Sequence, residues 1–262
     1  FFQRSCQRGL FLPLIYTRKN IPTQDVTVEM TIAENIKHLQ ENITDIISRL
    51  NRNDEITLVA VTKTHPVEII ETALQSGIEH IGENRVQEAR RKIPFLQAPY
   101  KGFHFIGHLQ SNKINQLLEL KPFLIQSVHS LELAKKLHLA LSRINRTQDI
   151  LIQINSSQEF SKSGFSFAEA KNAICQISTY STLHIKGLMT IGMLADPELS
   201  RPLFAQMKSL FEEIKTLRLP HMEMQYLSMG MSNDYVQALE EGSNMLRIGT
   251  AIFGERNYGV NE

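Results

Sequence analysis

The 262-residue sequence predicts an α/β fold: a single (β/α)8 barrel preceded by one extra N-terminal helix. Eight short apolar runs recur from residue 57 onward, and each of the first seven is followed by a segment with helical periodicity. These runs are continuously apolar rather than alternating, as in parallel strands that are covered on both faces. Their regular count favours a closed barrel over an open doubly wound sheet.

The extra helix is expected over residues 30–50, where MTIAENIKHLQENITDIISRL is amphipathic. Strands are expected at 57–61, 79–83, 104–109, 123–128, 150–154, 183–191, 224–229 and 244–254. The intervening helices are expected at 65–77, 84–93, 111–120, 130–144, 165–178, 201–217 and 233–242. Local signals support several of these boundaries: Gly77 closes one helix, Pro94 stops the next, and Ser111 is a candidate N-cap.

Residues 1–29 differ from the rest of the chain in charge. Four cations precede the first acidic residue, Asp25; they are Arg4, Arg8, Arg18 and Lys19. Such a segment is typical of a transit peptide, or of translated sequence upstream of a start at Met30. We favour the second interpretation because the amphipathic helix begins at Met30. Residues 1–29 are therefore treated as an extension outside the fold, and 30–262 as one barrel domain.

The overall composition excludes several classes of function. With 28 Lys and Arg against 27 Asp and Glu, the charge indicates neither a nucleic-acid binder nor a membrane-surface binder. Cys6 and Cys175 are too few for a disulfide framework and fit a reducing compartment. His104 and His108 are four residues apart, but in a strand and its exit, so no metal site is expected. We expect a cytoplasmic protein, or a mitochondrial one if residues 1–29 are a genuine transit peptide.

Two segments after the seventh and eighth runs predict a phosphate site. In (β/α)8 barrels the active site lies at the carboxyl ends of the strands, and phosphate is often held after strands 7 and 8. SMGMSND contributes Ser228 and Ser232, and RIGT contributes Gly249 and Thr250. Hydroxyls and exposed backbone N–H groups suit an anion. The alternative is that these residues only form turns and a cap.

Lys63 follows the apolar run LVAV directly. At the mouth of a barrel, low dielectric depresses the pKa of a lysine and frees its amine to attack a carbonyl. Alternatively, Lys63 extends to solvent or pairs with Glu83. A phosphate site in the same mouth favours an aldehyde that carries a phosphate. Two candidates are pyridoxal 5′-phosphate (PLP) and a sugar phosphate in an aldolase.

Arg247 discriminates between these two candidates. Arg247 and Gly249 share one face of the last strand, while Leu246 and Ile248 take the other. If the Arg247 face is inward, a permanent cation lies in the barrel. Beside the pyridine nitrogen of PLP, it would keep that nitrogen unprotonated and weaken the ring as an electron sink. This favours a protein that holds PLP over a transaminase; the alternative is a salt bridge to Glu240 or Glu241.

Motifs over residues 30–254 resemble those of the pyridoxal-phosphate homeostasis proteins. The matching segments, in order, are AVTKTHP, IGENRVQEA, HFIGHLQSNK, SKSGF, GLMTI, LSMGMSND and MLRIGTAIFG. The resemblance implies the PLP barrel of the alanine racemase N-terminal domain. It also implies that PLP forms an internal aldimine with Lys63, that Asn84 lies near the ring, and that Arg247 faces the pyridine nitrogen. Ser228, Ser232, Gly249 and Thr250 would hold the phosphate. The sequence departs modestly from the family at LMTIG and at Asn233, neither of which removes a bond to PLP.

The function that this resemblance implies is vitamin B6 homeostasis: the protein would buffer PLP or deliver it to PLP-dependent apoenzymes, without robust turnover and as a monomer. Related racemases complete their site with a second domain and a tyrosine from a partner subunit. Only eight residues follow Gly254, so no such domain is expected here. Because Tyr235 or Tyr258 could supply a base, a PLP-dependent racemase or decarboxylase is the alternative, followed by an aldolase without PLP.

Overall fold

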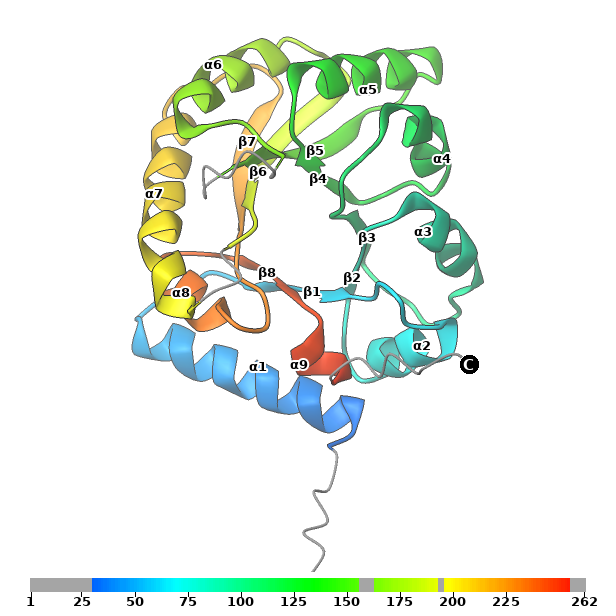
Figure 1. Cartoon of the computed structure of the whole chain (residues 1–262), viewed down its shortest axis with the longest axis vertical. Coiled ribbons are helices and arrows are strands. Elements are labelled where there is room, and N and C mark those ends of the chain that lie inside the picture. The colour runs from blue at the N-terminus through cyan, green and yellow to red at the C-terminus, as the bar shows by residue number, and fades with distance from the viewer. Residues whose placement is uncertain (1–29, 156–162, 193–195, 255–262) are drawn as a thin grey trace, which may run out of the picture.

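Eight parallel strands close into a barrel in chain order, from β1 to β8, with β8 pairing back onto β1 (Figure 1). The computed structural model describes residues 30–155, 163–192 and 196–254. The strands are β1 (Thr57–Val61), β2 (His80–Glu83), β3 (Gly102–Phe105), β4 (Leu124–Val128), β5 (Gln148–Ile154), β6 (Leu183–Thr190), β7 (Met222–Ser228) and β8 (Met245–Ile248). The predicted barrel is confirmed.

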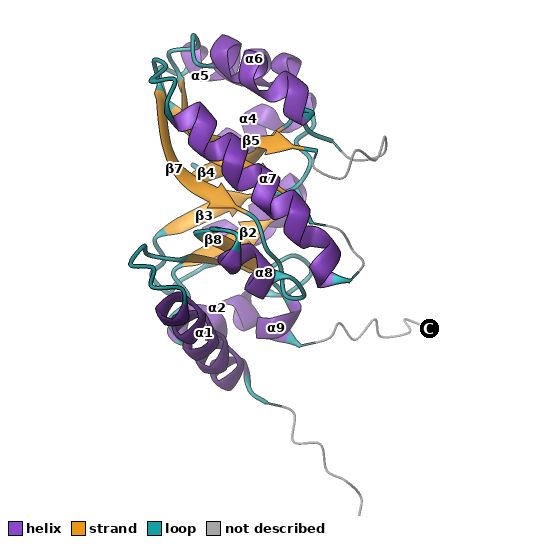
Figure 2. Ribbon diagram, turned by 90° about the vertical axis from the view of Figure 1, so that its left-hand side faces the viewer, coloured by secondary structure: helices purple, strands orange, loops and turns teal. Residues whose placement is uncertain are grey.

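Helices cover the outside of the barrel (Figures 1 and 2). They are α1 (Ile32–Arg49), α2 (Val67–Gln75), α3 (Val86–Lys92), α4 (Ile114–Glu119), α5 (Leu131–Arg143), α6 (Phe167–Ile177), α7 (Pro197–Lys215), α8 (Tyr235–Glu240) and α9 (Thr250–Phe253). Two 3₁₀ turns, η1 (Ile93–Phe95) and η2 (Ser111–Lys113), adjoin α3 and α4. In the described part of the chain, every helix is too short or too polar to cross a membrane.

The extra helix α1 begins with a capping box. The Thr31 side chain accepts the Glu34 backbone N–H, while the Glu34 carboxylate accepts the Thr31 N–H at 2.8 Å. One apolar stripe of α1 is buried, consisting of Ile36, Leu39, Ile43 and Ile46. The Asn35 amide donates to the Ile252 carbonyl at 3.0 Å and joins α1 to α9. The predicted helix is present, and it packs against the segment that follows β8.

Two strand predictions were wrong in their limits. The third strand was expected at 104–109 but is Gly102–Phe105, so His108 lies in the loop beyond it. The last was expected at 244–254, but β8 ends at Ile248 and residues 250–253 form α9. Short apolar runs do not distinguish a strand from a buried helical turn. In α9 the apolar residue Ile252 is buried because the turn packs against the barrel, not because a strand continues.

Alternation along the strands separates two apolar regions. Inside the barrel, Tyr226 packs against a small cluster, formed by Val59, Leu124, Leu151, Met189 and Met245. The larger core lies between strands and helices and includes Leu246 and Ile248 of β8. Successive strand side chains point to opposite faces, so Arg247 lies on the inner face. The candidate site at the barrel mouth is built partly from residues on this inner face.

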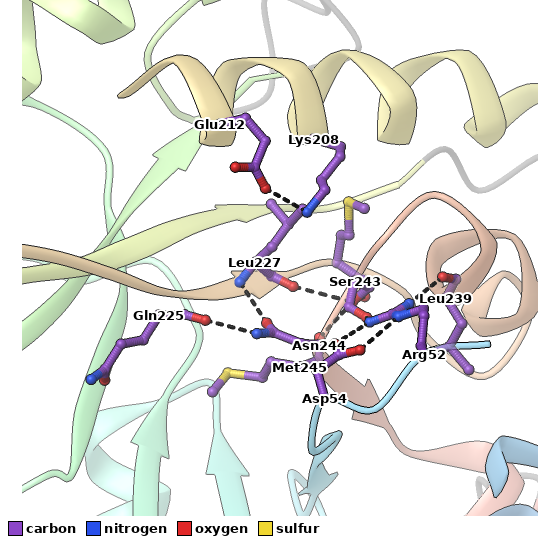
Figure 3. A network of polar contacts seen from close by, with 11 residues as sticks. Arg52, Asp54, Lys208, Glu212, Gln225, Leu227, Leu239, Ser243, Asn244 and Met245 are labelled. Carbon is purple, nitrogen blue, oxygen red and sulfur yellow. Dashed lines mark hydrogen bonds and ion pairs between the residues drawn. The ribbon is translucent and has the colours of Figure 1, made fainter. Parts of the chain in front are cut away.

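The regular pairing of β7 with β8 is short, at Ser228 and Met245, although backbone hydrogen bonds continue beyond it, as from the Arg247 N–H to the Gly230 carbonyl. Side chains add to this pairing (Figure 3). The Asn244 side chain accepts the Leu227 N–H at 2.8 Å and donates to the Gln225 carbonyl at 2.7 Å. Arg52, just before β1, donates to the Ser243 carbonyl at 2.7 Å and binds Asp54. These bonds hold β8 between its two neighbours, β7 and β1, and so position Arg247.

A buried ion pair joins the barrel to α3. Glu83 is fully buried, and its Oε1 lies 2.9 Å from Lys92 Nζ and 2.7 Å from Thr62 Oγ1. Lys92 also donates to Glu88 at 3.1 Å and to the Thr62 carbonyl at 3.0 Å. Burial raises the pKa of Glu83 although the bonds from Thr62 and Lys92 oppose that rise. Glu83, considered above as a partner for Lys63, is therefore held by Thr62 and Lys92.

We predict that Lys92→Met lowers the free energy of unfolding by about 3 kcal/mol at neutral pH, because it leaves the Glu83 charge buried and unpaired. Burial then raises the folded-state pKa of Glu83 further, so the loss should shrink as the pH falls and Glu83 becomes protonated. Urea unfolding measures both effects. Lys101→Met, which breaks an exposed pair with Glu79, is the control and should change stability by less than about 1 kcal/mol. Equal losses in the two variants would contradict this interpretation.

Candidate functional site

Lys63 lies two residues beyond β1, at the carboxyl end of the barrel, and is partly buried. Lys63 is four residues after Val59, which packs inside the barrel, so alternation along the strand would place both side chains on the same face. Its strand lies between β2 and β8, the strands that carry Asn84 and Arg247.

The turn that carries Lys63 is strained and braced from outside the barrel. Thr64 has φ of 69°, a left-handed conformation that is uncommon for a β-branched residue. The Thr64 N–H donates to Glu88 at 2.9 Å, and Glu88 is bound in turn by Lys92. The hydrogen bonds to Thr64 and Lys92 lower the pKa of Glu88 against the effect of burial. The buried ion pair at α3 is thus connected to the backbone beside Lys63.

Asn84 follows β2 and carries a buried oxygen, Oδ1, that has no hydrogen-bond partner among the described residues. An unpaired buried acceptor of this kind destabilises a protein, and at native sites it often marks a position that a ligand fills. Asn84 also lines a hollow of about 240 Å³ together with Gln153, Asn155 and His108. The predicted residue is therefore at the barrel mouth with an acceptor directed inward.

The loops after β7 and β8 are joined through Ser232. Its Oγ accepts the N–H groups of Gly249 at 3.3 Å and Ala251 at 3.2 Å. Among the described residues, a Cβ built on Gly249 would meet only Val61, at 3.7 Å, which is an ordinary contact. The neighbouring protein atoms therefore do not require glycine at 249, and space remains above its backbone. Ser232, Gly249 and Thr250, predicted as a phosphate site, lie together here.

Ser228 is placed differently from these three residues. It is fully buried inside the barrel, where its Oγ donates to Gln126 Oε1 at 2.7 Å and accepts from Arg247 Nη1 at 2.6 Å. Its hydroxyl is thus engaged by Gln126 and Arg247. We expected Ser228 to join the phosphate residues because it lies at the carboxyl end of a strand, but alternation along β7 turns its side chain into the barrel, on the same face as Tyr226.

Arg247 is 4% exposed and lies on the inner face of the barrel that alternation predicts. Nη2 donates to the Thr190 carbonyl at 2.7 Å, in addition to the bond from Nη1 to Ser228. Burial lowers its pKa to about 10, which still leaves the guanidinium charged at neutral pH. The alternative of a salt bridge to Glu240 or Glu241 is wrong, because those carboxylates bind Arg201 at the surface.

Sequence reasoning missed the polar side chains that share the barrel interior with Arg247, notably His104 on β3 and Gln126 on β4. The available signal was a polar residue at an inward position of an otherwise apolar strand. A second missed feature is the stacking of His108 on His129, with ring centroids 4.4 Å apart. His108 also contacts Ser163 at 3.1 Å. Of the two tyrosines considered as bases, Tyr235 begins α8 and Tyr258 lies outside the described residues.

The chain is similar to known proteins over most of its length. The family model for the alanine racemase N-terminal domain matches residues 35–257. The pyridoxal phosphate homeostasis protein of Pasteurella multocida is 39% identical over 234 residues, covering 87% of this chain and 99% of the relative. PipY of Synechococcus elongatus, solved with PLP bound, has a TM-score of 0.73 at 32% identity, covering 86% of this chain and 100% of PipY.

A more distant structure supports the fold alone. Alanine racemase of Clostridium difficile has a TM-score of 0.67 at 16% identity, and the match covers 86% of this chain but 57% of the racemase. The relatives at higher identity match over nearly their whole length. The barrel with its N-terminal helix, the mouth residues and these similarities together show that the chain belongs to the pyridoxal phosphate homeostasis protein family, on the alanine racemase N-terminal-domain fold.

Proposed function

We propose that this protein binds PLP at the barrel mouth, covalently through the Lys63 amine, and buffers it or delivers it to PLP-dependent apoenzymes. The observation that carries the proposal is the convergence of three features on the neighbouring strands β7, β8 and β1. These features are the Ser232 bridge between two loops, the inward guanidinium of Arg247, and Lys63 on a braced turn. A phosphate, a pyridine nitrogen and an aldehyde require these three kinds of group.

The residues present fit PLP. The N–H groups of Gly249 and Ala251 donate to Ser232 Oγ in this structure; a phosphate would take the place of that acceptor and would also accept hydrogen bonds from the hydroxyls of Ser232 and Thr250, without any lysine. The unpaired Asn84 oxygen suits a hydroxyl donor on a ring. We propose that Ser228 acts through Arg247, because its hydroxyl accepts a hydrogen bond from the Arg247 guanidinium.

We further propose that the protein holds PLP without robust turnover. Bound PLP supplies an electron sink, whose strength depends on protonation of its pyridine nitrogen. A guanidinium beside that nitrogen donates a hydrogen bond but does not transfer its proton, because the pKa of Arg247 stays near 10 even when buried. The ring would therefore remain a weak sink, which suits storage. We propose a monomer in the cytoplasm, or in mitochondria if residues 1–29, outside the described residues, are a transit peptide.

For Lys63→Ala we predict loss of covalent PLP with the fold retained, because the side chain lies at the mouth and not in the core. The measurement is the visible spectrum with added PLP before and after borohydride, followed by mass mapping of the reduced lysine. Lys113→Ala, at another lysine that lines the mouth region beside Asn84, is the matched control and should keep the adduct. A reduced adduct on another lysine in wild type, or loss of cooperative unfolding in the variant, would refute the assignment.

Gly249→Ala should weaken binding of PLP about tenfold, because the methyl group occupies the space above the backbone that a phosphate would use. The fold should survive, since the added Cβ lies 3.7 Å from its nearest neighbour and φ is −115°. Equilibrium titrations with PLP and with pyridoxal, which lacks the phosphate, measure the effect. Pyridoxal should bind wild type and variant equally. If both ligands weaken alike, the phosphate does not lie at Gly249.

Storage and catalysis are separated by two assays on the PLP-loaded wild type. We expect transfer of PLP to an added PLP-dependent apoenzyme, seen as recovery of that enzyme's activity. With L- or D-alanine we expect no sustained racemisation, followed by polarimetry or chiral chromatography. Multiple turnovers of either isomer would replace the storage proposal with the racemase alternative.

A further inference from the structure

A continuous line of hydrogen bonds runs through the barrel from Arg247 to the far end of β2. Beyond Ser228, the Gln126 side chain contacts His104, with Nε2 2.9 Å from His104 Nδ1. His104 Nε2 lies 2.9 Å from His80 Nδ1. His104 is fully buried, while His80 is partly exposed and lines a hollow of about 880 Å³ between α1 and the amino ends of the strands. The chain thus connects the site at the mouth with the opposite end of the barrel.

Arg247 determines the direction of every bond in this chain, because a guanidinium donates hydrogen bonds and does not accept them. Ser228 accepts from Arg247, so its own proton goes to Gln126 Oε1. The Gln126 nitrogen must then donate to His104 Nδ1, which therefore carries no proton. A neutral His104 has its proton on Nε2 and donates it to His80 Nδ1.

The neutral state of His104 agrees with its surroundings. Burial holds its pKa well below the usual value for histidine, and the neighbouring His80 acts in the same direction. At neutral pH a single tautomer, with the proton on Nε2, satisfies both Gln126 and His80. The other tautomer would place two donors against each other at Gln126, or force the amide to flip away from Ser228.

Among the described residues Arg247 forms no direct ion pair; the buried carboxylate of Asp234 attracts the guanidinium without such contact and raises its pKa, against the effect of burial. The acceptors for Arg247 are a hydroxyl and a backbone carbonyl. Each dipole of the chain turns its negative end towards the guanidinium, and hydrogen bonds in series strengthen one another in a low-dielectric interior. A carboxylate in the same place would cancel the charge that Arg247 presents. The neutral groups Ser228, Gln126 and His104 leave that charge intact and fix the plane of the guanidinium.

We propose that Gln126 and His104 are positioning residues for Arg247, which hold its guanidinium in the orientation that faces the pyridine nitrogen of PLP. Neither residue need contact the ligand; each acts through Ser228. The proposal rests on the proposed function for its ligand. The hydrogen-bond chain itself is a property of the protein without PLP, so the two can be tested separately.

The first measurement is made on the wild-type protein without PLP. Nitrogen-15 NMR of the histidine rings should show His104 with its proton on Nε2 at neutral pH. This measurement needs no variant and no ligand. A proton on Nδ1, or a charged ring, would contradict the hydrogen-bond directions inferred from Arg247 to His80, whatever the protein binds.

The second measurement uses His104→Phe, with His104→Asn as the conservative control. Phenylalanine removes the acceptor for Gln126, whereas asparagine retains an oxygen near the position of Nδ1. In the protein without PLP, His104→Phe should shift the Arg247 guanidinium NMR signals, and His104→Asn should restore them substantially. Unchanged Arg247 signals in a folded His104→Phe variant would overturn the positioning role.

The third measurement distinguishes an effect on Arg247 from an effect on the loops that would hold the phosphate. His104→Phe should weaken the binding of PLP about tenfold, which is the effect of losing one well-placed hydrogen bond to a charged group. The binding of inorganic phosphate should be the same as in wild type. A parallel loss for both ligands would indicate general damage to the mouth and overturn the proposal. If wild type fails to bind PLP, the proposed function fails, while the NMR results still decide whether the chain holds Arg247.

Discussion

A buried guanidinium that forms no direct ion pair with any described residue, and that Asp234 attracts only without contact, is the constraint on which the candidate site depends. Arg247 cannot lose its charge at neutral pH, so the barrel interior has to supply acceptors for it. Ser228 and the Thr190 carbonyl provide them, and Gln126 and His104 orient Ser228. This explains why polar residues occupy inner positions of β3, β4 and β7 that an apolar barrel core would otherwise fill. A positive group is thereby presented to the mouth with its charge intact.

The mouth is supported from both sides of the barrel wall. Inside, the Arg247 chain runs the length of the barrel. Outside, the Glu83–Lys92 pair extends through Glu88 to the Thr64 backbone, which holds the strained turn after Lys63. Hydrogen bonds from neighbouring side chains therefore hold both the backbone beside Lys63 and the Arg247 guanidinium. Such support is what a site needs to keep functional groups in place without help from the ligand.

The phosphate loops show a different kind of preorganisation. Ser232 Oγ accepts the N–H groups of Gly249 and Ala251, which holds the two loops together before an anion arrives; a bound phosphate would replace Ser232 Oγ as the acceptor. In the storage function proposed above, a preformed anion site limits the ordering required on binding.

The sequence by itself determined the barrel, the extra helix and the positions of Lys63, Asn84, Ser232, Gly249 and Thr250 near strand ends, because apolar period and chain order control these features. It also determined the inner face of β8, since alternation follows from strand geometry. Only the tertiary structure decided which residues meet across the barrel. His104, Gln126 and Ser228 lie 143, 121 and 19 residues before Arg247 in the sequence, and no local pattern links them. Their contacts depend on strand register, and a one-residue shift would turn these side chains to the other face.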